Sequence, residues 1–106
     1  MKLPFVCKFT HTYRYYDEHR ERFLYALFME YSKEKQAYYA ILLEENGKFH
    51  GRNSHRWLRW EQSYIEETLI PMERLPRKVL NTVEDQISIF NEVNRRSRER
   101  ITMSSL

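Results

Sequence analysis

The chain has 106 residues, 42% hydrophobic and 31% charged, with a formal net charge of +3. This length predicts a single domain, residues 1–106, and no apolar run approaches the ~20 residues that span a bilayer. Only two glycines and one cysteine occur, which excludes glycine-rich phosphate loops and an internal disulfide. No signal-peptide pattern opens the chain, so we expect a cytoplasmic protein with no membrane partner.

The first predicted element is a strand over residues 3–15. One face of this strand is mostly apolar or aromatic, because such residues recur with a period of two. Its members are Leu3, Phe5, Cys7, Phe9, His11, Tyr13 and Tyr15. His11 lies on this apolar face, and we interpret it as a half-buried, hydrogen-bonded histidine.

Residues 17–32 fit two structures. Phe23, Leu24, Leu27, Phe28 and Tyr31 are spaced as one stripe of a helix. The length of the segment and its Glu, Arg, Leu and Met content favour this helix. The alternative is a strand buried on both faces, because FLYALFMEY is almost continuously apolar.

A hairpin is predicted around Asn46-Gly47, because both residues tolerate a positive φ between two strands. The hairpin pairs residues 39–45 with residues 48–54, and a third strand over 55–62 continues it. The competing structure is a helix over 33–45 that ends at Asn46-Gly47. We expect a short extended piece and a turn over residues 63–75.

The last predicted element is a long helix over residues 76–101, followed by a frayed tail over 102–106. Pro76 suits the first helical turn, where its missing N–H costs nothing. The fold class is therefore α+β: a small antiparallel sheet of about three to four strands, one helix after the first strand, and the long C-terminal helix packed on the sheet.

One stripe of this helix suits either the sheet or a second chain. Its apolar positions repeat at spacings of three and four, with an asparagine that can set the register of a paired coil. The stripe comprises Leu80, Val83, Ile87, Phe90 and Asn94. Packing on its own sheet is the first interpretation, and a homodimer seam is the alternative.

Excess positive charge is confined to two short clusters, residues 48–60 and 95–100, which an acidic stretch separates. Arginine binds phosphate through its planar fork, and aromatic rings beside cations stack on bases. Nucleic-acid contacts are therefore predicted at Lys48, Arg52, Arg56, Trp57, Arg59, Trp60, Arg95, Arg96, Arg98 and Arg100. In a strand, Trp57 and Trp60 would face opposite ways, which leaves at most one of them exposed.

Three functions remain open after these exclusions. The first is a non-enzymatic protein that binds nucleic acid or an acidic protein surface and forms a homodimer through the helical seam described above. The second is a protein–protein interaction module: an adaptor, assembly subunit or inhibitor of the kind that phages and mobile elements encode. The third is a metal-independent ribonuclease that uses His50, His55, Arg52, Arg56 and a tyrosine. No metal-ligand motif occurs, so we expect no metal and no cofactor.

Overall fold

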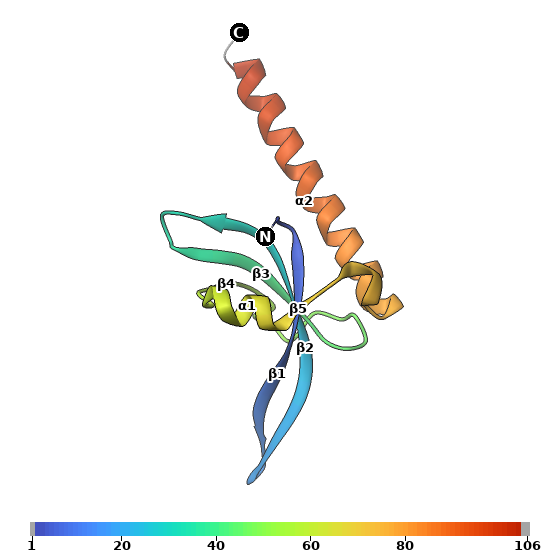
Figure 1. Ribbon diagram of the computed structural model, residues 1–106. Coiled ribbons are helices and arrows are strands. Elements are labelled where there is room, and N and C mark those ends of the chain that lie inside the picture. Colours follow the sequence, from blue (N-terminus) through green and yellow to red (C-terminus); the bar gives the residue numbers. More distant parts are fainter. Residues whose placement is uncertain (1, 105–106) are drawn as a thin grey trace.

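The computed structural model describes the backbone of residues 2–104 and the side chains of residues 2–98. An antiparallel sheet of five strands, ordered β4-β3-β2-β1-β5, has helices on both faces (Figure 1). In chain order the elements are β1 (Phe5–Tyr15), β2 (Glu18–Ser32), β3 (Ala37–Leu43), β4 (His55–Leu58), α1 (Gln62–Thr68), β5 (Leu69–Ile70), a 3₁₀ turn (Met72–Arg74) and α2 (Arg77–Ser104). The α+β class and the long C-terminal helix are confirmed.

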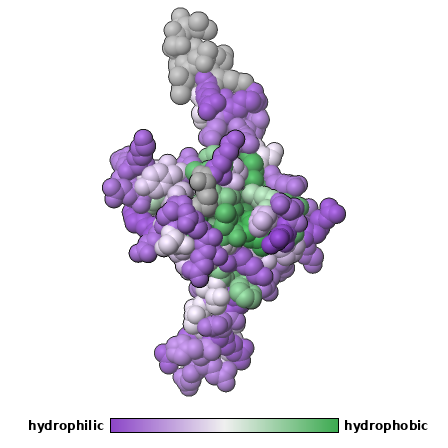
Figure 2. All heavy atoms as spheres, viewed as in Figure 1, coloured by the Kyte–Doolittle hydropathy of each residue, from purple (hydrophilic) through white to green (hydrophobic). Residues whose placement is uncertain are grey.

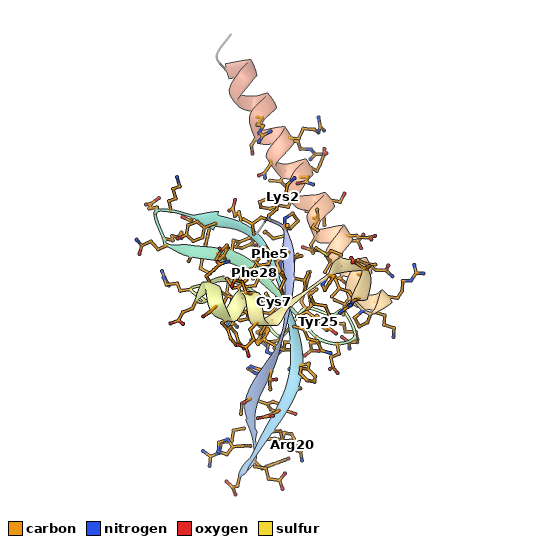
Figure 3. All side chains as sticks on the ribbon, in the orientation of Figure 1. Lys2, Phe5, Cys7, Arg20, Tyr25 and Phe28 are labelled. Carbon is orange, nitrogen blue, oxygen red and sulfur yellow. The ribbon has the colours of Figure 1, made fainter. Side chains whose placement is uncertain are left out.

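Strand β1 confirms the predicted first strand and pairs with β2 along its whole length, from Phe5 opposite Phe28 to Tyr15 opposite Glu18. The far end of this hairpin extends beyond the sheet as a two-stranded ribbon (Figure 1), and Arg20 lies near its tip (Figure 3). We call residues 10–23 the ribbon. The remaining strands and helices form the body.

The helix predicted for residues 17–32 is wrong, because this segment is strand β2. Residues 24–29 are buried at every position, whereas a surface helix would bury only one stripe. Strand β2 lies inside the sheet, so even-numbered side chains such as Phe28 pack toward α1, and odd-numbered ones such as Leu27 pack toward α2. The apolar run therefore serves two cores.

These two cores lie on opposite faces of the sheet. The α2 face joins Val6, Tyr25, Leu27, Met29, Ile41, Leu43, Leu75, Val79 and Val83. The α1 face joins Phe5, Cys7, Ala26, Phe28, Ala40, Leu42 and Ile65. Each helix thus buries one apolar stripe against alternate residues of the same strands, which is what fixes the register of the central strands.

The Asn46-Gly47 turn is present, but the hairpin is more open than predicted. Residues 37–43 form strand β3, so the predicted strand is confirmed and the helical alternative is wrong. On the side away from β2, however, β3 pairs with residues 55–58 and not with the predicted residues 48–54. Within 48–54 only Phe49 makes a bridge to β3. The third strand ends at Leu58, and residues 63–75 contain α1 and β5 where we expected an extended piece and a turn.

Helix α2 begins as predicted, with the Leu80 amide donating to the Pro76 carbonyl. Gly47 has a φ of +84°, and a Cβ there would overlap the Lys78 carbonyl, so glycine lets the 44–48 turn lie directly on α2. The Thr82 hydroxyl donates to the Gly47 carbonyl at 2.7 Å. Toward its C-terminus α2 runs away from the sheet (Figure 1). The frayed tail predicted over residues 102–106 is wrong for residues 102–104, which belong to helix α2, and residues 105–106 lie outside the described residues.

No helix among the described residues combines the length and the apolar character that crossing a membrane requires.

Candidate nucleic-acid interface

Four rings form a row on the α2 face at the β4 edge of the sheet. Phe49 contacts His55 with ring centres 5.0 Å apart, His55 lies 6.3 Å from Tyr39, and Tyr39 lies 5.6 Å from Trp57. The Lys35 ammonium lies 5.0 Å from the centre of the Trp57 ring. We call these four rings the ring row. Phe49, His55 and Trp57 are exposed, so the row presents ring surface to solvent with a cation at one end.

Trp60 lies on the opposite face, in the α1 core. Its ring packs edge-on against Phe9 at 4.9 Å, Phe28 at 5.3 Å and Tyr64 at 4.9 Å. The two tryptophans therefore face opposite ways, as the strand pattern indicates. Trp60 is held mainly by the core, and Trp57 is the tryptophan that a ligand could reach.

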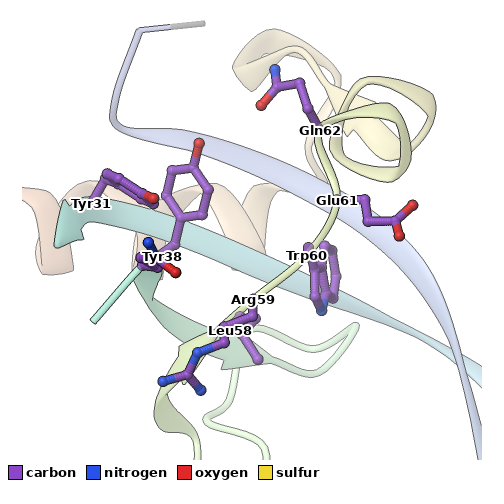
Figure 4. Close-up of a pocket in the computed structure, with 8 residues that line it drawn as sticks. Tyr31, Tyr38, Leu58, Arg59, Trp60, Glu61 and Gln62 are labelled. Atoms are coloured by element: carbon purple, nitrogen blue, oxygen red, sulfur yellow. The ribbon is translucent and has the colours of Figure 1, made fainter. Parts of the chain in front are cut away.

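A hollow of about 270 Å³ lies beside Trp60 on this second face (Figure 4). In Figure 4 the rings of Tyr38 and Trp60 stand on two sides of it, and Arg59 lies at its rim. Its lining residues are Tyr31, Gln36, Tyr38, Leu58, Arg59, Trp60, Glu61 and Gln62. The β4 edge thus carries aromatic surface on both faces, with amide and guanidinium donors on one of them.

The cations of residues 48–60 are spread around this edge. Lys48 and Arg52 are exposed in the loop before β4. Arg56 is opposite Ala40 in the ladder, on the α1 face, and its Nε donates to the Asn53 carbonyl at 2.8 Å. Arg59 is exposed beside the hollow. The first basic cluster is therefore a set of separate cations at one edge of the sheet.

The second basic cluster lies on helix α2. Arg95 and Arg96 both bind the Glu92 carboxylate, at 2.7 Å and 3.2 Å, which lowers the pKa of Glu92 and offsets part of the cluster's charge. Arg98 is exposed, and the side chain of Arg100 lies outside the described residues. The first cluster surrounds β4 and the second lies on α2, whose C-terminal part runs away from the sheet (Figure 1), so the two clusters are on different elements.

The predicted dimer seam is largely used by the chain itself. Val83 is fully buried between α2 and the sheet, and Leu80, Ile87 and Phe90 pack against the same core. Asn94 is exposed. Packing on its own sheet, the first interpretation of this stripe, therefore accounts for four of its five residues.

A polar cluster that sequence reasoning missed joins the ribbon to the loop before β4. Arg22 donates from Nη2 to Glu44 Oε2 at 3.0 Å and to His50 Nδ1 at 2.9 Å. His50 Nδ1 also lies 3.3 Å from the same Glu44 oxygen, so the three side chains meet at one point. The His11 ring lies edge-on to His50 at 5.2 Å, and burial, then the charges of His50, Arg22 and Arg56, lower the pKa of His11.

This cluster differs from the histidine pair of the ribonuclease hypothesis. His50 contacts His11 and Arg22, whereas His55 contacts Ser54, Phe49 and Tyr39. No local signal in the sequence could have found the cluster, because its members come from β1, β2 and a loop. Within the described residues, no three His, Cys, Asp or Glu side chains are grouped as a metal site.

Comparison with known proteins assigns this chain to no family. No family model matches it, and neither curated proteins nor solved structures give a significant match. Its function is therefore inferred from its own residues.

Proposed function

We propose that this protein is a non-enzymatic binding protein that holds single-stranded nucleic acid along the β4 edge. One observation carries the proposal: the ring row is a continuous series of partly exposed rings that ends at the ammonium of Lys35. Single strands are bound by this combination, in which bases stack on rings and cations follow the phosphates. Each stacked base contributes about 1–3 kcal/mol, so a short row is enough for measurable affinity.

The arrangement favours a single strand over a duplex. Stacking on Tyr39 or Trp57 requires a base whose face is open, and bases in a duplex are already stacked on one another. Arg56 and Arg59 lie at the same edge on its α1 side, where they offer phosphate contacts to a strand that crosses the edge. The arginines of α2 follow Val93, which borders the same hollow as Tyr39 and His55, and they provide a further, sequence-independent contact.

A protein partner is the second candidate, and a different surface favours it. Apolar residues gather in the middle of the face shown in Figure 2, where a hollow of about 440 Å³ lies beside β5. Its lining residues are Pro4, Phe5, Val6, Glu66, Leu69, Ile70, Pro71 and Met72. Such a patch without cations suits an apolar protein segment better than a phosphate chain.

Titration of labelled single- and double-stranded oligonucleotides at low and physiological salt tests the proposal. We expect the single strand to bind more tightly and its affinity to fall with salt. Trp57→Ala should weaken binding roughly 5- to 100-fold, the equivalent of one lost stack. Tyr16→Ala is the matched control, because Tyr16 is 82% exposed at the ribbon turn and outside the row, and it should bind like wild type.

Three outcomes would contradict the proposal. Absence of binding at low salt would overturn it and leave the hollow beside β5 as the better candidate surface. Equal losses for Trp57→Ala and Tyr16→Ala would show that the row has no special part. Labelled RNA should remain intact after long incubation with the purified protein. Cleavage of the RNA would instead support the ribonuclease hypothesis.

Charge reversal separates the two basic clusters. Arg56→Glu with Arg59→Glu should weaken single-strand binding more than reversal of Arg95, Arg96 and Arg98, because the first pair lies at the β4 edge itself, on its α1 side. Each lost phosphate contact should also flatten the dependence of affinity on salt. A larger effect from the α2 arginines would place the main contact on the helix.

A further inference from the structure

Helix α2 carries apolar side chains beyond those that pack on its own sheet. Val79 and Val83, in its first half, are fully buried. Ile89 and Val93 are 55% and 56% exposed, although both are β-branched aliphatic residues. Aliphatic side chains on a projecting helix gain stability only when another surface covers them.

These side chains belong to a second stripe, next to the one that faces the sheet. Thr82, Gln86, Ile89, Val93 and Arg96 follow one another at spacings of four and three, the spacing at which two helices pack together. We call these five residues the outer stripe. It is distinct from the stripe through Leu80, Val83 and Ile87, which the sheet already covers.

The outer stripe borders an open apolar hollow. A space of about 250 Å³ lies between α2 and the sheet. Its lining residues are Met29, Tyr39, Ile41, His55, Gln86, Ile89, Phe90 and Val93. The exposed apolar surface of α2 is therefore continuous with apolar surface of the body, up to Tyr39 and His55 of the ring row, and Trp57 and Phe49 lie outside this hollow.

The charges along the outer stripe fit a second copy of the same helix, running the opposite way. Asp85 lies one turn before Ile89, and Arg96, which also binds Glu92 of its own chain at 3.2 Å, lies one turn after Val93. In an antiparallel pair whose twofold axis crosses the outer stripe midway between Ile89 and Val93, Ile89 of each copy lies beside Val93 of the other. The same axis brings Asp85 of each copy within one turn of Arg96 of the other, so both ends of the contact pair opposite charges.

A parallel pair lacks this complementarity. Residue 85 would then face residue 85, and residue 96 would face residue 96, which places like charges together at both positions. A strongly basic or acidic partner helix would match only one end of the outer stripe. Because the charges of the outer stripe complement their own reversed order, a second copy of the same helix is the partner that fits them.

We propose that two copies of this chain form a symmetric dimer in which their α2 helices pack antiparallel along Ile89 and Val93. The dimer does not depend on nucleic-acid binding and would present two β4 edges in one assembly. It uses the outer stripe, so the core stripe through Val83 stays on its own sheet.

Light scattering and sedimentation of the full chain at tens of micromolar test this dimer. We expect the mass of two chains, with dissociation on dilution. Ile89→Lys with Val93→Lys should raise the dissociation constant roughly tenfold or more, because it places lysines where the apolar pair meets. Both positions face solvent in the single chain, so circular dichroism and the thermal midpoint should stay close to wild type.

Ser88→Lys with Asn91→Lys is the matched control. It adds the same charge to neighbouring exposed positions outside the outer stripe, and it should leave the dimer intact. A wild-type chain of monomer mass at these concentrations would overturn the proposal, as would a dimer that survives the lysines at 89 and 93.

Charge exchange tests the direction of the helices. Asp85→Arg alone should weaken the antiparallel dimer, and adding Arg96→Asp in the same chain should restore it, because the two positions meet across the axis. In a parallel dimer neither change would rescue the other. If the chain proves to be a monomer, the comparison of oligonucleotide binding by Trp57→Ala and Tyr16→Ala remains a valid test of the nucleic-acid interface. The two proposals can therefore be refuted independently.

Discussion

The β1–β2 hairpin is one continuous pair of strands with two physically different halves. Near the body, β2 residues 24–29 are buried on both faces, because α1 covers one side and α2 the other. In the ribbon, residues 18–23 of the same strand are exposed at every position. Pairing with β1 continues without a break through both halves.

Different interactions hold the two halves. The ribbon relies on its ladder and on cations over rings, with Arg20 at 4.4 Å from Tyr15 and Lys8 at 4.5 Å from Phe23. Such exposed contacts contribute about 0.5–1 kcal/mol each. In the body, whole aromatic and aliphatic side chains leave water, at about 1.5–3 kcal/mol each. Stability therefore concentrates where both faces of a strand are covered.

The largest expected contrast is between two phenylalanines of β2. Phe28 is fully buried and stacks on Phe5 at 5.0 Å, whereas Phe23 is 46% exposed at the root of the ribbon. Phe28→Ala should lower the free energy of unfolding by about 3–5 kcal/mol, because it empties the α1 core. Phe23→Ala should cost about 1 kcal/mol or less. Urea unfolding of both variants measures the difference, and equal losses would show that the ribbon is part of the core.

The two glycines offer the next contrast. Gly47 and Gly51 both have a positive φ, so alanine is strained at either position. A Cβ at Gly51 meets nothing within 4 Å, whereas one at Gly47 overlaps the Lys78 carbonyl of α2. Gly51→Ala should cost about 1–2 kcal/mol. Gly47→Ala should cost about 1–3 kcal/mol more, because α2 must shift. A smaller loss at 47 in thermal unfolding would mean that the turn does not rest on the helix.

Substitutions in the ribbon should have a smaller effect. Arg20→Ala removes the cation over Tyr15 and an exposed ion pair with Glu18. We expect a loss of about 0.5–1 kcal/mol in the free energy of unfolding, reduced further by added salt. Arg14→Ala, which removes only the exposed pair with Asp17, is the control and should cost less. A loss of several kcal/mol for Arg20→Ala would mean that the tip packs against something in the assembled protein.

The smallest expected effect is a pH dependence at the root of the ribbon. Burial, followed by the charges of His50, Arg22 and Arg56, lowers the pKa of His11 below its ordinary 6.5. The unfolded chain then binds a proton more readily, so this contribution to stability is complete above pH 6.5 and is lost as the pH falls below it. His11→Gln should show a weaker loss than wild type in unfolding measured on both sides of pH 6.5. Equal losses would assign the pH dependence to other groups.

Local patterns were sufficient for elements with one apolar stripe or one apolar face. Strand β1 alternates, and α2 begins at a proline and repeats at helical spacings, so both were predicted from neighbouring residues alone. Strand β2 was not, because Phe23, Leu24, Leu27 and Phe28 suit a helix as well as a doubly covered strand. The choice between helix and strand depends on the position of this segment between β1 and β3, and residues far away in the sequence determine that position.

The candidate site could be predicted only in part for the same reason. The opposite faces of Trp57 and Trp60 follow from the period of a strand. The ring row also needs Tyr39, Phe49 and Lys35, which reach Trp57 and His55 only after β3 pairs with β4. The separation of the two arginine clusters depends on the direction in which α2 leaves the sheet, which no local pattern encodes.

The most direct test of base stacking on the ring row is the fluorescence of Trp57. Trp60→Phe leaves Trp57 as the chain's one tryptophan while a ring still fills the α1 core. Titration with a single-stranded oligonucleotide should quench this fluorescence, and the quenching should saturate at the concentration at which the labelled strand binds. Unchanged Trp57 fluorescence while the oligonucleotide binds would contradict the proposal that the β4 edge is the nucleic-acid interface.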